Sequence, residues 1–156
     1  MHLRPWNRHS DYKVLVKWWD QYDFGKVPKE CLPPLGLVVE DALGTSICAG
    51  GLYCCTGTKF GFMEWIVANK TANLKSIHKG LNLCITEIFK LAKKYNIELI
   101  YSMTANTSLH KRYTKYHNMK LVENNVKTFL MDLTKSYTDL EWISDDQQLK
   151  EQLKDK

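Results

Sequence analysis

The chain has 156 residues, enough for one domain with a sizeable core and too few for two ordinary ones. Charged residues at 25% and hydrophobic residues at 44% are typical of a globular protein. No apolar run approaches the ~20 residues that cross a bilayer, and the first residues lack a signal-peptide core. We therefore expect neither a membrane protein nor a secreted one.

The net charge of +5 is unevenly distributed along the chain. From Thr134 onward four lysines stand against six acidic residues, a balance of −2, so residues 1–133 carry +7. A basic body attracts nucleic acid, an acidic protein or a phosphorylated cofactor. Because the lysines are scattered and form no basic tract, nucleic acid is the least favoured of these partners.

The five cysteines include the adjacent pair Cys54–Cys55 and no C-x-x-C spacing. This pattern indicates reduced thiols in the cytoplasm, and it argues against a disulfide framework or a zinc site, so no metal is expected. Cys48, Cys54 and Cys84 fall on predicted apolar faces, where inert packing is the usual role. A catalytic thiol is the alternative.

The chain begins with a predicted edge strand, His2–Trp6, in which Pro5 favours a strand end. Ser10 is predicted to cap a helix, whose apolar face is Val14, Leu15, Trp18 and Tyr22. Residues 23–36 are rich in Gly and Pro and are predicted to be mostly loop.

Two strands, Leu37–Glu40 and Thr45–Cys55, follow and are joined by a predicted hairpin at residues 41–44. The pair Gly50–Gly51 lies inside the second strand. Glycines at such a place predict a bulge or a close approach of the backbone.

The centre of the chain is a predicted strand, a polar loop and a long helix. The strand is Phe60–Val67, the loop is Ala68–Ser76, and the helix continues from Ile77 to a left-handed stop at Asn96. The first helical turn is basic, with Lys75, His78, Lys79 and Gly80. Unpaired N–H groups and the helix dipole make such a start suited to phosphate, although an ordinary β-α unit would have the same pattern.

A short strand, Ile97–Met103, is predicted next, parallel to the central strand by the crossover rule. A helix over Ser108–Tyr116 follows, and then two strands, Met119–Glu123 and Val126–Leu133. We therefore expect one domain over residues 1–133 and a tail over residues 134–156, which is either a short amphipathic helix or a frayed end.

The element order β-α-β-β-β-α-β-α-β-β, with several local strings, resembles the GNAT superfamily (Gcn5-related N-acetyltransferases) over residues 1–133. The similarity is greatest to small GNAT-like proteins of bacteriophages. The strings are Leu3-Arg4-Pro5-Trp6, Leu32–Val39, Glu64–Asn69, Asn106–Leu109 and Lys111–Tyr113. The resemblance implies an α/β fold in which helices flank a mixed, twisted sheet of about six to seven strands.

The resemblance also implies an acetyl-CoA-dependent N-acyltransferase that moves an acetyl group to an amine by direct attack in a ternary complex. The acceptor would be a protein lysine, an N-terminus or a small amine, with a host protein among the options. By the same resemblance Glu64 is the candidate base and Tyr113 the candidate proton donor to sulfur. The implied cofactor-binding residues are Ile66, Val67, Ala68, Lys75, His78, Lys79, Gly80 and Asn106.

The sequence departs from the family at the pyrophosphate loop, where His78 stands in place of the first glycine. A GNAT fold that has lost catalysis and serves as a binding or virion-associated module is therefore the alternative function. Glu64 and Tyr113 also have structural alternatives, as a salt-bridged strand residue and a core aromatic. The sequence leaves the acceptor and the oligomeric state open, a homodimer included.

Overall fold

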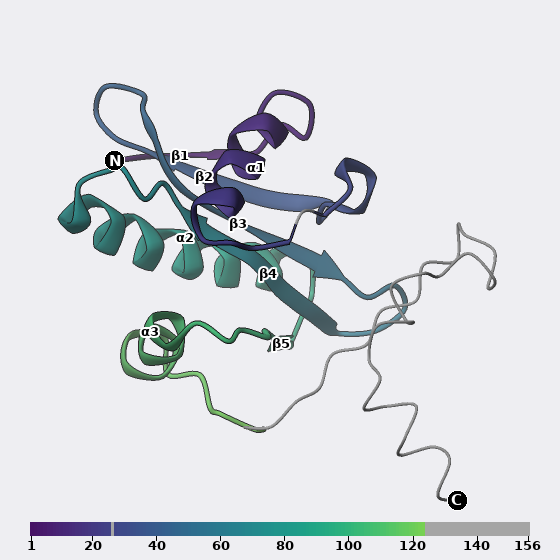
Figure 1. Cartoon of the computed structure of the whole chain (residues 1–156). Helices are drawn as coiled ribbons and strands as arrows, with labels where there is room; N and C mark the ends of the chain where they lie inside the picture. Colours follow the sequence, from purple (N-terminus) through teal and green to yellow (C-terminus); the bar gives the residue numbers. More distant parts are fainter. Residues whose placement is uncertain (26, 124–156) are drawn as a thin grey trace, which may run out of the picture. The chain divides into compact units, whose positions relative to one another are not determined.

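The computed structural model describes residues 1–25 and 27–123. Figure 1 shows the arrangement of the helices and strands in this part of the chain. The strands are β1 His2–Pro5, β2 Leu35–Glu40, β3 Ser46–Cys54, β4 Phe60–Ala68 and β5 Leu99–Tyr101. The helices are α1 Tyr12–Gln21, α2 Leu74–Lys94 and α3 Thr107–His117, with a 3-10 turn, η1, at Lys29–Cys31.

The five strands form one sheet in the order β1-β2-β3-β4-β5. Neighbours from β1 to β4 are antiparallel, and β5 lies parallel to β4, as the crossover through α2 predicts. The sheet is covered by α1 on one face and by α2 on the other (Figure 1). The predicted mixed sheet with flanking helices is confirmed, with five strands in the described residues.

The core on the α1 face of the sheet is rich in tryptophan. Leu15, Trp18 and Trp19 recur at three- and four-residue steps in α1 and are buried against β2, β3 and β4. The prediction that Ser10 caps this helix is wrong. The N-cap is Asp11, whose carboxylate accepts hydrogen bonds from Arg4 and from the Asn7 N–H instead of capping the helix.

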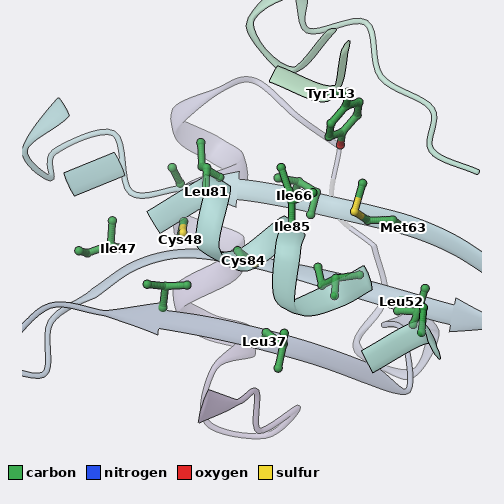
Figure 2. Close-up of a cluster of buried hydrophobic side chains, with 14 of the residues drawn as sticks. Leu37, Ile47, Cys48, Leu52, Met63, Ile66, Leu81, Cys84, Ile85 and Tyr113 are labelled. Atoms are coloured by element: carbon green, nitrogen blue, oxygen red, sulfur yellow. The ribbon is translucent and has the colours of Figure 1, made fainter. Parts of the chain in front are cut away.

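The core on the other face is formed by α2, whose buried residues follow the helical period. Figure 2 shows Leu81, Cys84 and Ile85 of this helix among side chains of the strands in the same core. Asn96 adopts a φ of 59°, which confirms the predicted left-handed stop. The predicted start at Ile77 is wrong. The helix begins at Leu74, three residues earlier, because the Asn73 side chain caps it there.

Residues 41–44 form the predicted hairpin turn, in which the Asp41 carboxylate accepts N–H bonds from Leu43 and Thr45. The bulge predicted at the glycine pair is confirmed, because the register between β3 and β4 shifts between Ala49 and Gly51. A Cβ atom at Gly50 would lie 2.2 Å from Cδ1 of Ile66, so the glycine leaves room for this core side chain.

The contacts divide the chain into two units, Met1–Lys120 and Leu121–Lys156. The predicted strand at Met119–Glu123 is absent from the described residues. Asn118 takes a left-handed conformation and the Met119 N–H bonds to the Tyr113 carbonyl, so the chain here closes α3. The predicted partner strand, the 133/134 boundary and the tail lie outside the described residues. None of the described helices is long and apolar enough to span a membrane.

Candidate active site

A bulge in β4 shapes the centre of the sheet. Ala49 pairs with Val67 and Gly51 with Glu64, so two residues of β4 stand opposite one residue of β3. Trp65 in this bulge has a φ of 60°, a costly conformation for a large side chain. Its indole packs 5.2 Å from the Trp19 ring and donates a 3.1 Å hydrogen bond to the Tyr53 hydroxyl. These contacts hold the bulge in place.

The ladder between β4 and β5 ends at the pair Phe62 and Tyr101. Two residues further, the Glu64 carboxylate accepts a 3.0 Å hydrogen bond from the Met103 N–H, in place of the strand pairing that has stopped. Burial raises the pKa of Glu64 from 4.5 to about 7, because the cost of desolvation exceeds the help from the Met103 N–H. Glu64 therefore changes charge near neutral pH, which suits a general base.

Tyr113 approaches the same place from α3. Its ring is buried in the core, and Figure 2 shows its hydroxyl directed toward the side of β4 that carries Met63 and Ile66. The hydroxyl of Ser102 donates to the Tyr113 oxygen at 3.3 Å. Ser102 and Met103 are consecutive, so one short segment after β5 holds both Tyr113 and Glu64.

Burial, with a contribution from the charge of Glu64, raises the pKa of Tyr113 from 10.0 to about 12. The hydroxyl thus keeps its proton at neutral pH. Since Ser102 donates to the oxygen, the Tyr113 hydrogen is left for a third group. Glu64 therefore changes charge near neutral pH while Tyr113 stays protonated, and both groups are held near the point where the parallel strands β4 and β5 separate.

A pocket of about 200 Å³ is lined by the residues that follow in β4 and by the α3 residue before Tyr113, whereas Glu64 and Tyr113 themselves do not line it. Its lining combines the end of β4, one face of α2, one face of α3 and the segment after α1. Three of the residues with a predicted cofactor role, Ile66, Val67 and Ala68, belong to this lining. Beyond Phe62 the edge of β4 has no paired strand in the described residues, so its backbone groups are open to a ligand.

Asn106 also lines the pocket, and it is the N-cap of α3. Its side-chain oxygen accepts the N–H groups of Ser108 at 2.9 Å and Leu109 at 3.1 Å. Because the oxygen is committed to the cap, the amide NH2 group is the part that a ligand can use.

Arg112 is a pocket residue to which the sequence had given no role. Its guanidinium donates to the Asn82 side chain at 2.6 Å and to the His78 carbonyl at 3.1 Å. No carboxylate among the described residues pairs with it, and desolvation lowers its pKa. Its spacing from Leu109, three residues along α3, is the signal that places both on one helix face. A half-buried, unneutralised cation in a pocket is suited to an anionic ligand.

The structure does not bring the four residues of the predicted phosphate site together. Lys75 and Lys79 are exposed and lie roughly 160° around α2 from the face that lines the pocket. His78 is exposed, and its ring stands edge-on to Tyr116 at 5.4 Å. Gly80 is buried, and a Cβ there would lie 3.1 Å from Sγ of Cys48. Gly80 therefore allows α2 to pack closely on β3.

The first turn of α2 is already capped. The Asn73 side chain accepts the N–H groups of Lys75 at 2.9 Å and Ser76 at 3.3 Å. A phosphate at this helix start would have to displace Asn73. In the part of the chain that the structure describes, no group of three or more His, Cys, Asp or Glu side chains is placed to hold a metal ion.

Two of the cysteines lie deep in the core on the α2 face. Cys48 and Cys84 are both inaccessible to solvent. A hydrogen bond with Cys84, together with burial, raises the pKa of Cys48. A thiol that stays protonated and buried is a poor nucleophile, so the packing role predicted for these two residues fits the structure.

Comparison with known proteins gives a clear answer for the fold. Neither family models nor curated protein sequences match this sequence. Solved structures do match. The Mycobacterium tuberculosis protein Rv2747, solved in complex with CoA, aligns with a TM-score of 0.61 at 15% identity, over 82% of this chain and 76% of that one.

Two further matches are acetyltransferases. Glucosamine-6-phosphate N-acetyltransferase of Arabidopsis thaliana aligns with a TM-score of 0.59 at 11% identity, over 83% of this chain and 98% of that one. An acetyltransferase of Trypanosoma brucei aligns with a TM-score of 0.56 at 10% identity, over 83% and 99% of the two chains. The chain therefore has the α/β fold of the GNAT acetyltransferases.

Proposed function

We propose that this chain is an N-acyltransferase that moves an acetyl group from acetyl-CoA to an amine. The observation that supports the proposal is that Glu64 and Tyr113 are held by one segment where β4 and β5 separate, while the nearby residues Ile66 and Arg112 line a pocket. The fold shared with acetyltransferases, and with a protein solved with CoA, supports it. The bacteriophage origin and the cytoplasmic location stay predictions from the sequence.

In this proposal Glu64 receives the proton of the incoming amine. An alkylammonium has a pKa near 10, and a normal carboxylate near 4.5 would be a poor base for it. Burial brings the Glu64 pKa to about 7 and so narrows the difference between the pKa of this base and that of the amine. The amine nitrogen forms a bond to the acetyl carbon, the bond from that carbon to sulfur breaks, and the thiolate of CoA leaves.

Tyr113 stabilises the departing thiolate in the proposed reaction. A thiol has a pKa of about 8.5, so complete proton transfer from a tyrosine near 12 would be uphill by more than three units. We therefore infer that the Tyr113 hydroxyl donates a strong hydrogen bond to sulfur, and that the thiolate takes its proton from water after it leaves. The hydroxyl is in the correct protonation state for this at every physiological pH.

The pocket has features that fit acetyl-CoA as the donor. The open edge of β4 at Ile66–Ala68 offers backbone groups to the amides of the pantetheine arm and to the thioester oxygen. Asn106 adds an amide, and Arg112 adds the charge that a phosphate requires. Lys75, His78 and Lys79 contribute at longer range in this arrangement.

The second candidate function is the binding module without catalysis. The capped first turn of α2 favours it, because Asn73 occupies the N–H groups to which a pyrophosphate would bind. In this alternative the fold and the pocket are kept, and no transfer occurs.

Calorimetric titration with acetyl-CoA, followed by a transfer assay with a panel of amines, tests the proposal. We expect saturable binding, and Tyr113→Phe should keep this affinity while the transfer rate falls about 10²-fold, since it keeps the ring and removes only the hydroxyl. Tyr116→Phe, one turn along α3 and exposed, is the matched control and should be unchanged. Absence of binding at millimolar acetyl-CoA would contradict the proposal, and binding without transfer would favour the module.

A further inference from the structure

Three aromatic rings stand together on the sheet outside both cores. Phe60 and Phe62 of β4 lie with their ring centres 5.1 Å apart, and Tyr101 of β5 lies 6.0 Å from Phe62 and 6.4 Å from Phe60. All three are half-buried, and none is packed against either cluster of core residues. Phe60, Phe62 and Tyr101 are called the aromatic patch below.

The aromatic patch is on the face of the sheet that α1 covers only in part. Gly61 and Met63 point to the α2 face, since Met63 belongs to that core and a Cβ on Gly61 would meet Leu52 and Ile97. By strand alternation Phe60 and Phe62 point to the α1 face. An apolar group left accessible in this way is typical of a binding surface.

Glu64 stands two residues beyond Phe62 on the same strand and the same face. No cation among the described residues pairs with its carboxylate, which accepts a hydrogen bond from the Met103 N–H. Burial raises the pKa of Tyr53, and the charge of Glu64 adds to this rise; Tyr53 lies on the α1 side, where it accepts the bond from Trp65. The carboxylate thus influences groups on both faces of the sheet, Tyr53 on one and Tyr113 on the other.

We infer that the acceptor is a small primary amine carried by an aromatic ring, with the ring on the aromatic patch and the nitrogen at Glu64. Aromatic rings pair with one another in edge-to-face or offset stacks, and an unpaired carboxylate attracts an ammonium group. Two residues of a strand span ~6.7 Å, so a ring over Phe62 reaches Glu64 through a linker of two or three carbons. This inference rests on the proposed function and specifies its acceptor.

The same features disfavour other classes of amine. The basic residue next to the patch, Lys59, pairs with Glu98, so a sugar phosphate would have to compete with that carboxylate for it. A polyamine has charges along its whole length, and the patch offers rings where further carboxylates would be needed.

Transfer rates for a matched set of amines test the inference. We expect kcat/KM for 2-phenylethylamine and 3-phenylpropylamine to exceed that for spermidine and glucosamine 6-phosphate by tenfold or more. Phe62→Leu should lower the phenylethylamine value about fivefold and leave spermidine unchanged. Tyr95→Leu, an exposed tyrosine at the end of α2, is the control and should change neither. Equal rates for phenylethylamine and spermidine, or an equal loss on both in Phe62→Leu, would overturn the inference.

Binding of 2-phenylethylamine to the full chain without acetyl-CoA, followed by NMR line broadening, separates this inference from the proposed function. Saturable binding that weakens in Phe62→Leu supports the amine site even if no transfer occurs. Transfer to spermidine with no binding of phenylethylamine would keep the transferase and overturn the aromatic acceptor. A large fall in the melting temperature of Phe62→Leu, with amine binding unchanged, would show that the aromatic patch serves packing and would also overturn the inference.

Discussion

Two regions of this molecule differ in whether their charged side chains have a partner of opposite charge. At the start of the chain, Arg4 donates two hydrogen bonds to Asp11, of 2.7 and 2.9 Å, and one of 2.6 Å to Glu40. At the far end of the sheet, Glu64 and Arg112 have no partner of opposite charge in the described residues.

The pKa directions of the two carboxylates follow from this difference. Burial alone would raise the pKa of Asp11, but the hydrogen bonds from Arg4 and the Asn7 N–H outweigh it and the pKa is lowered. At Glu64 the single N–H bond does not outweigh burial, and the pKa is raised. A partner of opposite charge makes a buried carboxylate stabilising, and the lack of one makes it available for chemistry at a cost in stability.

The largest expected effect is at the paired end. Asp11→Asn should lower the free energy of unfolding by about 3 kcal/mol at pH 7, because it leaves the partly buried Arg4 with Glu40 as its one carboxylate partner in the described residues. Urea denaturation measures this. Glu98→Gln, in the exposed pair with Lys59, is the control and should cost less than about 1 kcal/mol.

The pH dependence sharpens the same test. Since the pKa of Asp11 is lowered in the folded state, its stabilisation is present above the ordinary carboxyl pKa and is lost as the pH falls through the folded value. The difference between wild type and Asp11→Asn should therefore shrink in acid. An equal difference at pH 7 and pH 2 would mean that packing, and not charge, is lost.

Glu64→Gln should act in the opposite direction and is the second effect in size. The folded state binds more protons than the unfolded state between pH 4.5 and about 7, so the stability of the wild type falls as the pH rises through this window. At pH 8 the variant should be more stable than the wild type by about 2 kcal/mol, and at pH 4 the difference should vanish. Denaturation at both pH values measures it, and a difference independent of pH would contradict the desolvation of Glu64.

The sequence alone could predict the element order because the apolar periods of α2 and the strands are regular, and because turn residues such as Gly44 and Asn96 have φ values near 79° and 59°. The predicted starts of α1 and α2 were wrong for a local reason. The Asn73 side chain caps α2, whereas the Asp11 carboxylate bonds to Arg4 and to the Asn7 N–H, and the burial pattern does not report those bonds.

The site was only partly predictable for a different reason. Glu64 and Tyr113 could be named from the resemblance, but the place where they meet depends on the end of one ladder and on the left-handed Trp65. The spacing of residues along the sequence reveals neither of these two features. Arg112 is a further case, because its lack of a carboxylate partner is a property of the packed helices. Tertiary context decides such features.

The smallest effect concerns the unpaired cation. Arg112→Gln should weaken acetyl-CoA binding about tenfold, which corresponds to ~1.4 kcal/mol, because it removes the pocket charge while an amide can still reach Asn82. Lys79→Ala, on the outer face of α2, should weaken it no more than two- to threefold, and only at low salt, since exposed charges are screened. Calorimetry at 20 and 300 mM salt separates the two. Equal losses in both variants, or a larger loss in Lys79→Ala, would return the phosphate contact to the start of α2 and leave Arg112 as a tie between α2 and α3.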